Sequence, residues 1–105
     1  MVRKLDCAVI QTFPGSPVIP GMEERTFPCG FSPSSKEAVS GSDLVIAIGT
    51  EIGEPVWEGY RGHWAAGDAN RKWIHIERDP LSIGVNRQIH APLVGDLRDV
   101  VPQLT

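Results

Sequence analysis

Four short runs of apolar residues along the chain predict β-strands. They are Cys7–Thr12, Asp43–Gly49, Lys72–Glu77 and Ala91–Val94. The first shows no alternation of polar and apolar positions, as expected of a strand buried on both faces of a parallel sheet. The second is the strongest strand signal in the sequence. Since helical or irregular segments separate the runs, the pattern favours an α/β fold over an all-β fold.

Two short helical segments lie between these runs. The first begins at Ser34 or Ser35, either of which can cap it, and ends at Gly41. The second is a helical turn over residues 79–83, where an Asp at the cap position is followed by Pro at the first helical position.

A last helix is predicted over residues 97–104, capped by Asp96. Its apolar residues recur at helical spacing, at Leu97, Val100, Val101 and Leu104. Because proline interrupts a helix interior, Pro102 predicts that this helix bends or ends early.

Two long stretches show no periodicity, residues 16–33 and residues 54–71. The first contains four prolines, which exclude a continuous helix. We therefore expect a long loop in each, of the kind that is usually functional or packed against another element.

Composition limits the chain to one ordinary globular domain. It has 105 residues, of which 41% are apolar and 22% charged, with a net charge of -3. No basic stripe points to nucleic acid, and no segment predicts a membrane span or a membrane-surface helix. The two cysteines form no CxxC pair, so we expect a reduced, cytoplasmic protein.

Glycines and polar residues follow the ends of three predicted strands. Ligands bind at the carboxyl ends of parallel strands, so these residues are candidate binding positions. The alternative is that the glycines form turns and that the aspartates cap helices. The candidates are Gly49, Thr50, Glu51, Glu77, Arg78, Asp79, Gly95 and Asp96.

Three segments closely resemble, in order and spacing, the central domain of thiamine diphosphate-dependent enzymes. They read SGSDLVIAIGTEIGEPV, RKWIHIERDPLSIGVNR and PLVGDLRDVVPQL. The family includes acetolactate synthases, benzoylformate decarboxylases and related lyases. The resemblance covers residues 36–104, whereas residues 5–33 match only in outline.

This resemblance implies a Rossmann-like parallel sheet in three layers, of the DHS-like NAD/FAD-binding type. A complete family member has six strands. The family's opening strand, glycine-rich turn and first helix would precede Met1, so we expect an incomplete first βα unit. Residues 1–105 would then be a single central domain, truncated or cut from a longer enzyme.

The resemblance also implies cofactors and partners. Thiamine diphosphate and Mg²⁺ would belong to the parent enzyme, held by a pyrimidine-binding domain before this unit and a diphosphate-binding domain after it. Some members bind FAD or ADP across the strand ends, which gives the eight candidate residues a cofactor-binding role. Against this, the glycine-rich turn is missing, and Glu51 and Glu77 add negative charge to an anion site.

Other chemistry-bearing residues form no catalytic or metal-binding pattern. The segment 67–70, Gly-Asp-Ala-Asn, is similar to the family's Gly-Asp-Gly motif but lacks its second glycine, so we interpret it as a turn. We therefore expect no catalytic residue and no metal ligand in this chain. We expect Glu51, Glu54 and Glu58 to lie in a solvated loop. The histidines His63, His75 and His90 are scattered, and His75 is expected to be a strand residue with satisfied hydrogen bonds. Cys7 and Cys29 are expected to be buried small apolar residues. Trp57, Tyr60 and Trp64 are expected to be packing residues.

The leading hypothesis is thus a structural and interaction domain of a thiamine diphosphate-dependent lyase or synthase acting on 2-keto acids. It would not be catalytic alone and would assemble as a homo-oligomer. The alternative is a nucleotide-binding domain for FAD or ADP. A stand-alone enzyme is disfavoured because no nucleophile–base pair or metal set is visible.

Overall fold

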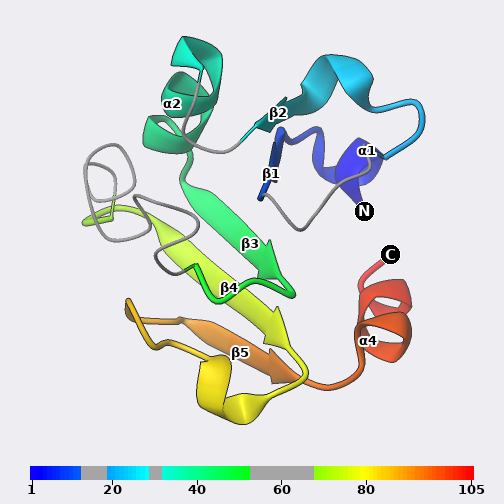
Figure 1. Ribbon diagram of the computed structural model, residues 1–105, viewed down its shortest axis with the longest axis vertical. Helices are drawn as coiled ribbons and strands as arrows, with labels where there is room; N and C mark the ends of the chain where they lie inside the picture. The colour runs from blue at the N-terminus through cyan, green and yellow to red at the C-terminus, as the bar shows by residue number, and fades with distance from the viewer. Residues whose placement is uncertain (13–18, 29–31, 53–67) are drawn as a thin grey trace.

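A computed structural model describes residues 1–12, 19–28, 32–52 and 68–105. The helices and 3-10 turns are α1 (Val2–Leu5), η2 (Glu23–Arg25), α2 (Pro33–Ser40), η4 (Pro80–Ser82) and α4 (Leu97–Gln103). The strands are β1 (Val9–Gln11), β2 (Thr26–Pro28), β3 (Leu44–Ile48), β4 (Lys72–Glu77) and β5 (Ala91–Val94). Figure 1 shows their arrangement.

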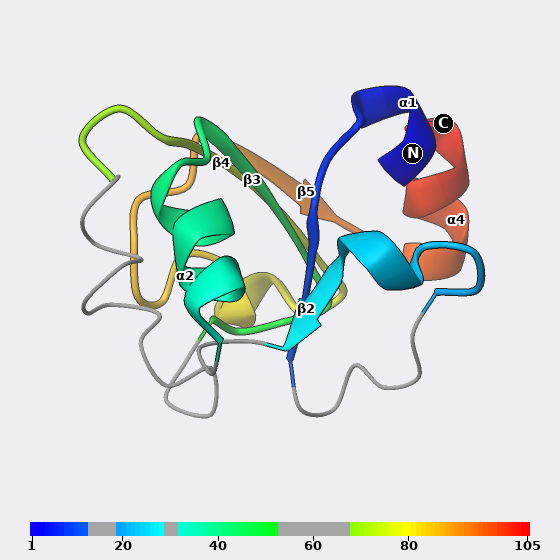
Figure 2. The ribbon, with the colours of Figure 1, turned by 90° about the horizontal axis from the view of Figure 1, so that it is seen from above.

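All the strand pairs among the described residues are parallel. β3, β4 and β5 form one sheet in that order, with Leu44 opposite Lys72 and Ile74 opposite Ala91. β1 and β2 form a second, two-stranded sheet. In Figure 2, α2 lies on one side of the strands and α4 on the other. The molecule is therefore a three-layered, parallel α/β fold, as the sequence predicted.

The core lies between α2 and the β3–β4 pair. The central strand β4 is the most deeply buried element, with its Ile76 side chain fully inaccessible to solvent. Beside it lies a small cluster of buried apolar side chains. Each fully buried aliphatic side chain contributes about 1.5–3 kcal/mol of transfer free energy, so the cluster supplies a large share of the stability of a small domain. Its members are Val39, Ala47, Ile52 and Trp73, with Ile10, Val45 and Ile89 packed against them.

The helix starts are fixed by side-chain caps. Asp96 caps α4 and Asp79 caps η4, as predicted. α2, however, is capped by Ser32 and not by Ser34 or Ser35. Ser35 instead lies at the third helical position, where it receives the Ser32 backbone N–H and completes a capping box. The predicted cap at Ser34 or Ser35 was thus wrong by two or three residues, because the reciprocal bonds of Ser32 and Ser35 place the cap at Ser32.

Three elements were not predicted. Residues 16–33 were expected to be loop throughout, but they contain η2 and β2. β2 is only 3 residues long, and Phe27 pairs with Ile10 of β1. A strand this short shows no periodicity, so only its partner reveals it. The helix α1 has only 4 residues, which is also too short to show a periodic pattern in the sequence. Most of the second expected loop, residues 54–67, lies outside the described residues.

Candidate functional site

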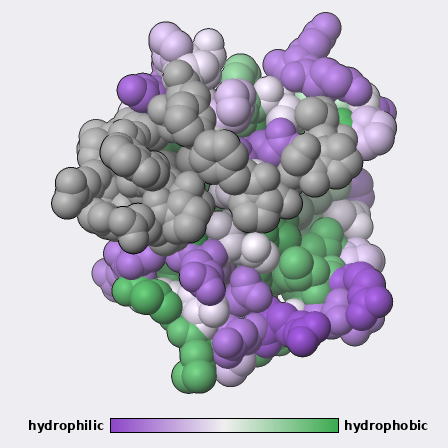
Figure 3. All heavy atoms as spheres, viewed as in Figure 1, coloured by the Kyte–Doolittle hydropathy of each residue, from purple (hydrophilic) through white to green (hydrophobic). Residues whose placement is uncertain are grey.

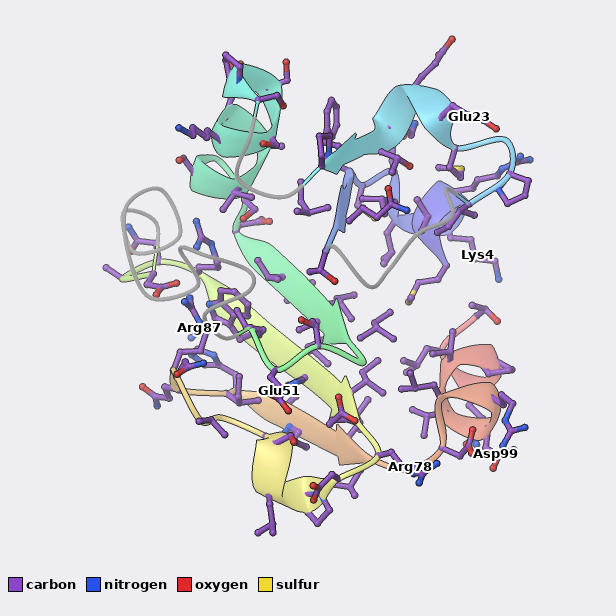
Figure 4. All side chains as sticks on the ribbon, in the orientation of Figure 1. Lys4, Glu23, Glu51, Arg78, Arg87 and Asp99 are labelled. Carbon is purple, nitrogen blue, oxygen red and sulfur yellow. The ribbon has the colours of Figure 1, made fainter. Side chains whose placement is uncertain are left out.

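The carboxyl ends of β3, β4 and β5 lie at one edge of the sheet, and the structure brings the predicted residues together there. The N–H of Gly49 donates to the Ile76 carbonyl at 2.9 Å, and that of Gly95 donates to the Glu77 carbonyl at 3.1 Å. Each glycine therefore extends its strand's ladder by one residue before the chain turns. In Figure 4, Arg78 lies at this edge, whereas Glu51 lies farther back, over β4.

Both glycines admit α4 to the sheet edge. A Cβ atom on Gly49 would lie 2.9 Å from Cδ1 of Leu97, and one on Gly95 would lie 2.8 Å from Cγ2 of Val100. Gly49 also has φ of +60°, which favours glycine. The close approach that the sequence suggested for a ligand is used here by a helix.

The two aspartates have structural hydrogen bonds. Oδ1 of Asp79 accepts the N–H of Leu81 at 2.9 Å, and Oδ1 of Asp96 accepts the N–H of Arg98 at 2.9 Å. A carboxylate at this position accepts a backbone N–H of the first turn that has no partner within the helix. Its negative charge also interacts favourably with the positive end of the helix dipole.

Asp96 also forms a two-pronged pair with the Arg98 guanidinium, at 3.1 Å to Nε and 2.9 Å to Nη2. These bonds hold the pKa of Asp96 below its ordinary value, and the charge of Arg78 adds to the effect. The same pair raises the pKa of Arg98. A carboxylate oxygen of Glu77 accepts the backbone N–H of Arg78 at 2.7 Å. The Arg78 residue is exposed.

Thr50 begins a tight turn after β3. Its carbonyl lies 2.8 Å from Nε2 of His75, and its hydroxyl accepts the N–H of Ile52 at 3.3 Å. Facing a carbonyl, Nε2 of His75 must carry the proton. Its Nδ1 is buried without a hydrogen-bond partner, so His75 is only partly satisfied, contrary to our expectation. Ile52 is buried at φ of +52°, and Asn86 holds its carbonyl at 3.0 Å.

A cluster around Asp68 was missed by sequence reasoning. Its carboxylate accepts from Nε1 of Trp73 at 3.1 Å, from Nη1 of Arg71 at 3.2 Å and from Nη1 of Arg87 at 2.9 Å. The Arg87 guanidinium stacks on the Trp73 ring at 4.2 Å, and burial lowers the pKa of Arg87. The Arg71 side chain is fully buried and also donates to the carbonyls of Ser42 and Val39.

Residues 68–70 do form a turn, as expected, but Asp68 is more than a turn residue. Its single carboxylate pairs with the guanidiniums of Arg71 and Arg87 near the start of β4, at the opposite end of the strand from the candidate site. One signal was available: a strand tryptophan that is buried usually needs an acceptor for its indole N–H.

The remaining candidates add no reactive group to this edge. Within the described ranges, no three His, Cys, Asp or Glu side chains gather as a metal site would require. Cys7 is free and half-buried, not buried as expected. No helix in the described part of the chain is long and apolar enough to cross a membrane. The candidates outside the described residues are Cys29, Glu54, Trp57, Glu58, Tyr60, His63 and Trp64.

The parallel sheet, the helices on both faces and the turn residues at the strand ends define a Rossmann-like domain. Residues 1–104 match the family model described as "Thiamine pyrophosphate enzyme, central domain". The chain belongs to this family, as its sequence indicated. No solved structure matches the chain.

Similar curated proteins are acetolactate synthases and a decarboxylase. The acetolactate synthase of Mycobacterium bovis is 37% identical over 67 residues, which are 64% of this chain and 10% of that protein. The acetolactate synthase large subunit of Corynebacterium glutamicum is 37% identical over 71 residues, 68% of this chain and 11% of that protein. Oxalyl-CoA decarboxylase of Escherichia coli is 30% identical over 77 residues, 73% of this chain and 13% of that protein. The chain thus spans about a tenth of the length of these relatives.

Proposed function

We propose that this chain is the scaffold domain of a thiamine diphosphate-dependent lyase or synthase acting on 2-keto acids. It links the pyrimidine-binding and diphosphate-binding domains and contributes to homo-oligomer packing in a cytoplasmic enzyme. Thiamine diphosphate and Mg²⁺ are held by those neighbours, and the cofactor supplies the electron sink of the reaction. The supporting observation is that the strand-end glycines and aspartates hold α4 and η4 in place.

A chimaera tests the scaffold role. This chain replaces the corresponding segment of the Corynebacterium glutamicum relative, which is 37% identical over 71 residues. We expect the chimaera to assemble and to retain acetolactate formation, since no catalytic group has been exchanged. The matched control carries Gly95→Val, which drives a side chain into α4 and should reduce assembly and activity together. A folded, assembled chimaera without activity would show that the domain carries more than a scaffold role.

A second candidate function is the binding of FAD or ADP at the same edge. It is favoured by one observation: Arg78 is exposed at the end of β4 and lies close enough to Asp96 to lower its pKa. A guanidinium there can bind a phosphate, and the carboxylates can bind ribose hydroxyls or an adenine amine.

Heat unfolding in millimolar ADP or FAD tests the nucleotide proposal. Ligand at about 100 times its Kd adds about 2.7 kcal/mol to the free energy of unfolding, which raises the Tm measurably. Arg78→Ala should abolish the rise, and Lys72→Ala, at the far end of the same strand, should leave it intact. An unchanged Tm at millimolar nucleotide removes this candidate and leaves the scaffold role standing.

A further inference from the structure

The strand β5 lies at one side of the three-stranded sheet. Its only strand neighbour among the described residues is β4, and Figure 1 shows β5 as the outermost of the three strands. A strand in this position presents backbone N–H and C=O groups that have no partner in the sheet. Such groups can pair with a strand of another molecule. We call this row of outward groups the outer edge of β5.

Apolar side chains around the outer edge would favour such pairing. Val94 of β5 is 54% exposed, and Leu81 and Val85, in the connection that leads to β5, are 84% and 65% exposed. Figure 3 shows apolar atoms at the surface along the border of the molecule where η4 and β5 lie. Because an exposed apolar edge strand is a site of aggregation, this edge needs a feature that prevents pairing.

The hydrogen bonds to β4 fix the direction of each backbone group of β5. The N–H of Gly95 donates to the Glu77 carbonyl at 3.1 Å, and the register pairs Glu77 with Val94. Along a strand, the N–H and C=O groups of alternate residues point to the same neighbour. The N–H of Leu93 therefore also points towards β4, whereas the backbone groups of positions 92 and 94 point outward.

Proline occupies the first of these two outward positions. Pro92 lies opposite His75 and is exposed. Since proline has no N–H, the ladder to β4 loses no bond at this position, whereas the outer edge loses one of its two donors. The edge is left with the outward carbonyls of Pro92 and Val94 and with the single N–H of Val94. An incoming strand would find no alternating row of donors and acceptors.

We propose that Pro92 closes the outer edge of β5 against strand addition, so that this edge meets a partner only through side chains. Two copies of the chain then cannot join their sheets through β5 across a two-fold axis, although the exposed apolar side chains nearby would favour contact. The carbonyls of Pro92 and Val94 can still accept hydrogen bonds from side-chain donors. This role of Pro92 is independent of the scaffold function.

Pro92→Val in the complete chain tests this role. Valine restores the outward N–H and favours a strand, while the bonds of Leu93 and Gly95 to β4 remain. Sedimentation over a concentration series should show association beyond that of the parent chain. In amide hydrogen exchange, the outward N–H of Val94 should exchange quickly in the parent and about tenfold or more slowly in the associated variant. The amide of Leu93 should be protected in both, which shows that β5 is still paired with β4.

Two further variants separate the hydrogen bond from the apolar side chain. Pro92→Thr restores the same N–H with a polar side chain and should also associate. The matched control combines Pro92→Val with Val94→Pro, which moves the missing donor to the other outward position, and it should behave like the parent. Association of Pro92→Val without that of Pro92→Thr, or equal association of the control, would assign the effect to apolar contact and overturn the proposal. Unchanged association of both single variants with Leu93 protected would overturn it too, as would loss of Leu93 protection in both.

Discussion

Among partly exposed residues in the described part of the chain, replacement of Asp68 by Ala should cause one of the largest losses in the free energy of unfolding. The carboxylate accepts hydrogen bonds from two guanidiniums and from the indole N–H of Trp73. Removing one partner of a buried ion pair costs about 3–5 kcal/mol, since the other charge is left uncompensated. Asp68 itself is 37% exposed, so water can reach part of the gap, and we expect the loss in free energy of unfolding to be about 2–3 kcal/mol.

Urea unfolding followed by Trp fluorescence measures this loss. With a typical slope of about 1–3 kcal/mol/M, a 2–3 kcal/mol change moves the midpoint by roughly 1 M or more. Asp68→Asn keeps an acceptor for Trp73 and should lose less. Asp99→Asn, on exposed α4, is the matched control and should change the midpoint little. If Asp68→Ala lost less than about 1 kcal/mol, the reasoning that this carboxylate compensates the buried Arg71 would be refuted.

Three further predictions concern the helices at the sheet edge. Gly95→Ala should cost about 1–3 kcal/mol in urea unfolding because its Cβ would lie 2.8 Å from Val100; adding Val100→Ala should recover part of the loss. Asp96→Asn should reduce the acid sensitivity of folding. Arg98 holds the pKa of Asp96 in the folded state below its unfolded value of about 3.9. The pair therefore stabilises the fold above that pH and stops doing so as the pH falls through the folded pKa. Unfolding curves measured from pH 7 to pH 2 should differ most between Asp96→Asn and the parent at neutral pH and should converge in acid. Ser32→Ala should cost about 0.5–2 kcal/mol by removing the cap of α2, measured by the same unfolding assay.

The strands that were easiest to predict are those whose burial is set by their own side chains. β4 and β5 have the predicted bounds, and β3 is one residue shorter at each end. Their apolar runs of 5, 6 and 4 residues are shorter than a typical helix, which favours strands. Gly49 and Gly95 mark where β3 and β5 end. Asp79 and Asp96 were equally readable, because a cap bonds a backbone group only two residues away.

What escaped prediction depends on contacts between distant positions. β2 exists because Phe27 pairs with Ile10, and a 3-residue segment carries no signal of that pairing. The partners of Asp68 include Arg87, 19 positions away. The use of Gly49 and Gly95 to admit α4 also required the structure, because a glycine in sequence predicts close approach without saying what approaches.

The parallel order of β3, β4 and β5 has a consequence for how fast this chain folds. The paired residues Leu44 and Lys72 are 28 positions apart, and Ile74 and Ala91 are 17 apart, so neither ladder can begin from a local hairpin. The difference in loop-closure free energy between the two ladders is only about 0.4 kcal/mol, less than thermal energy. Chain connectivity therefore does not decide which neighbour docks first. The apolar side chains of β4 must gather both neighbours in a nucleus of distant segments, and the folding time should lie in the millisecond range or slower, typical of high contact order.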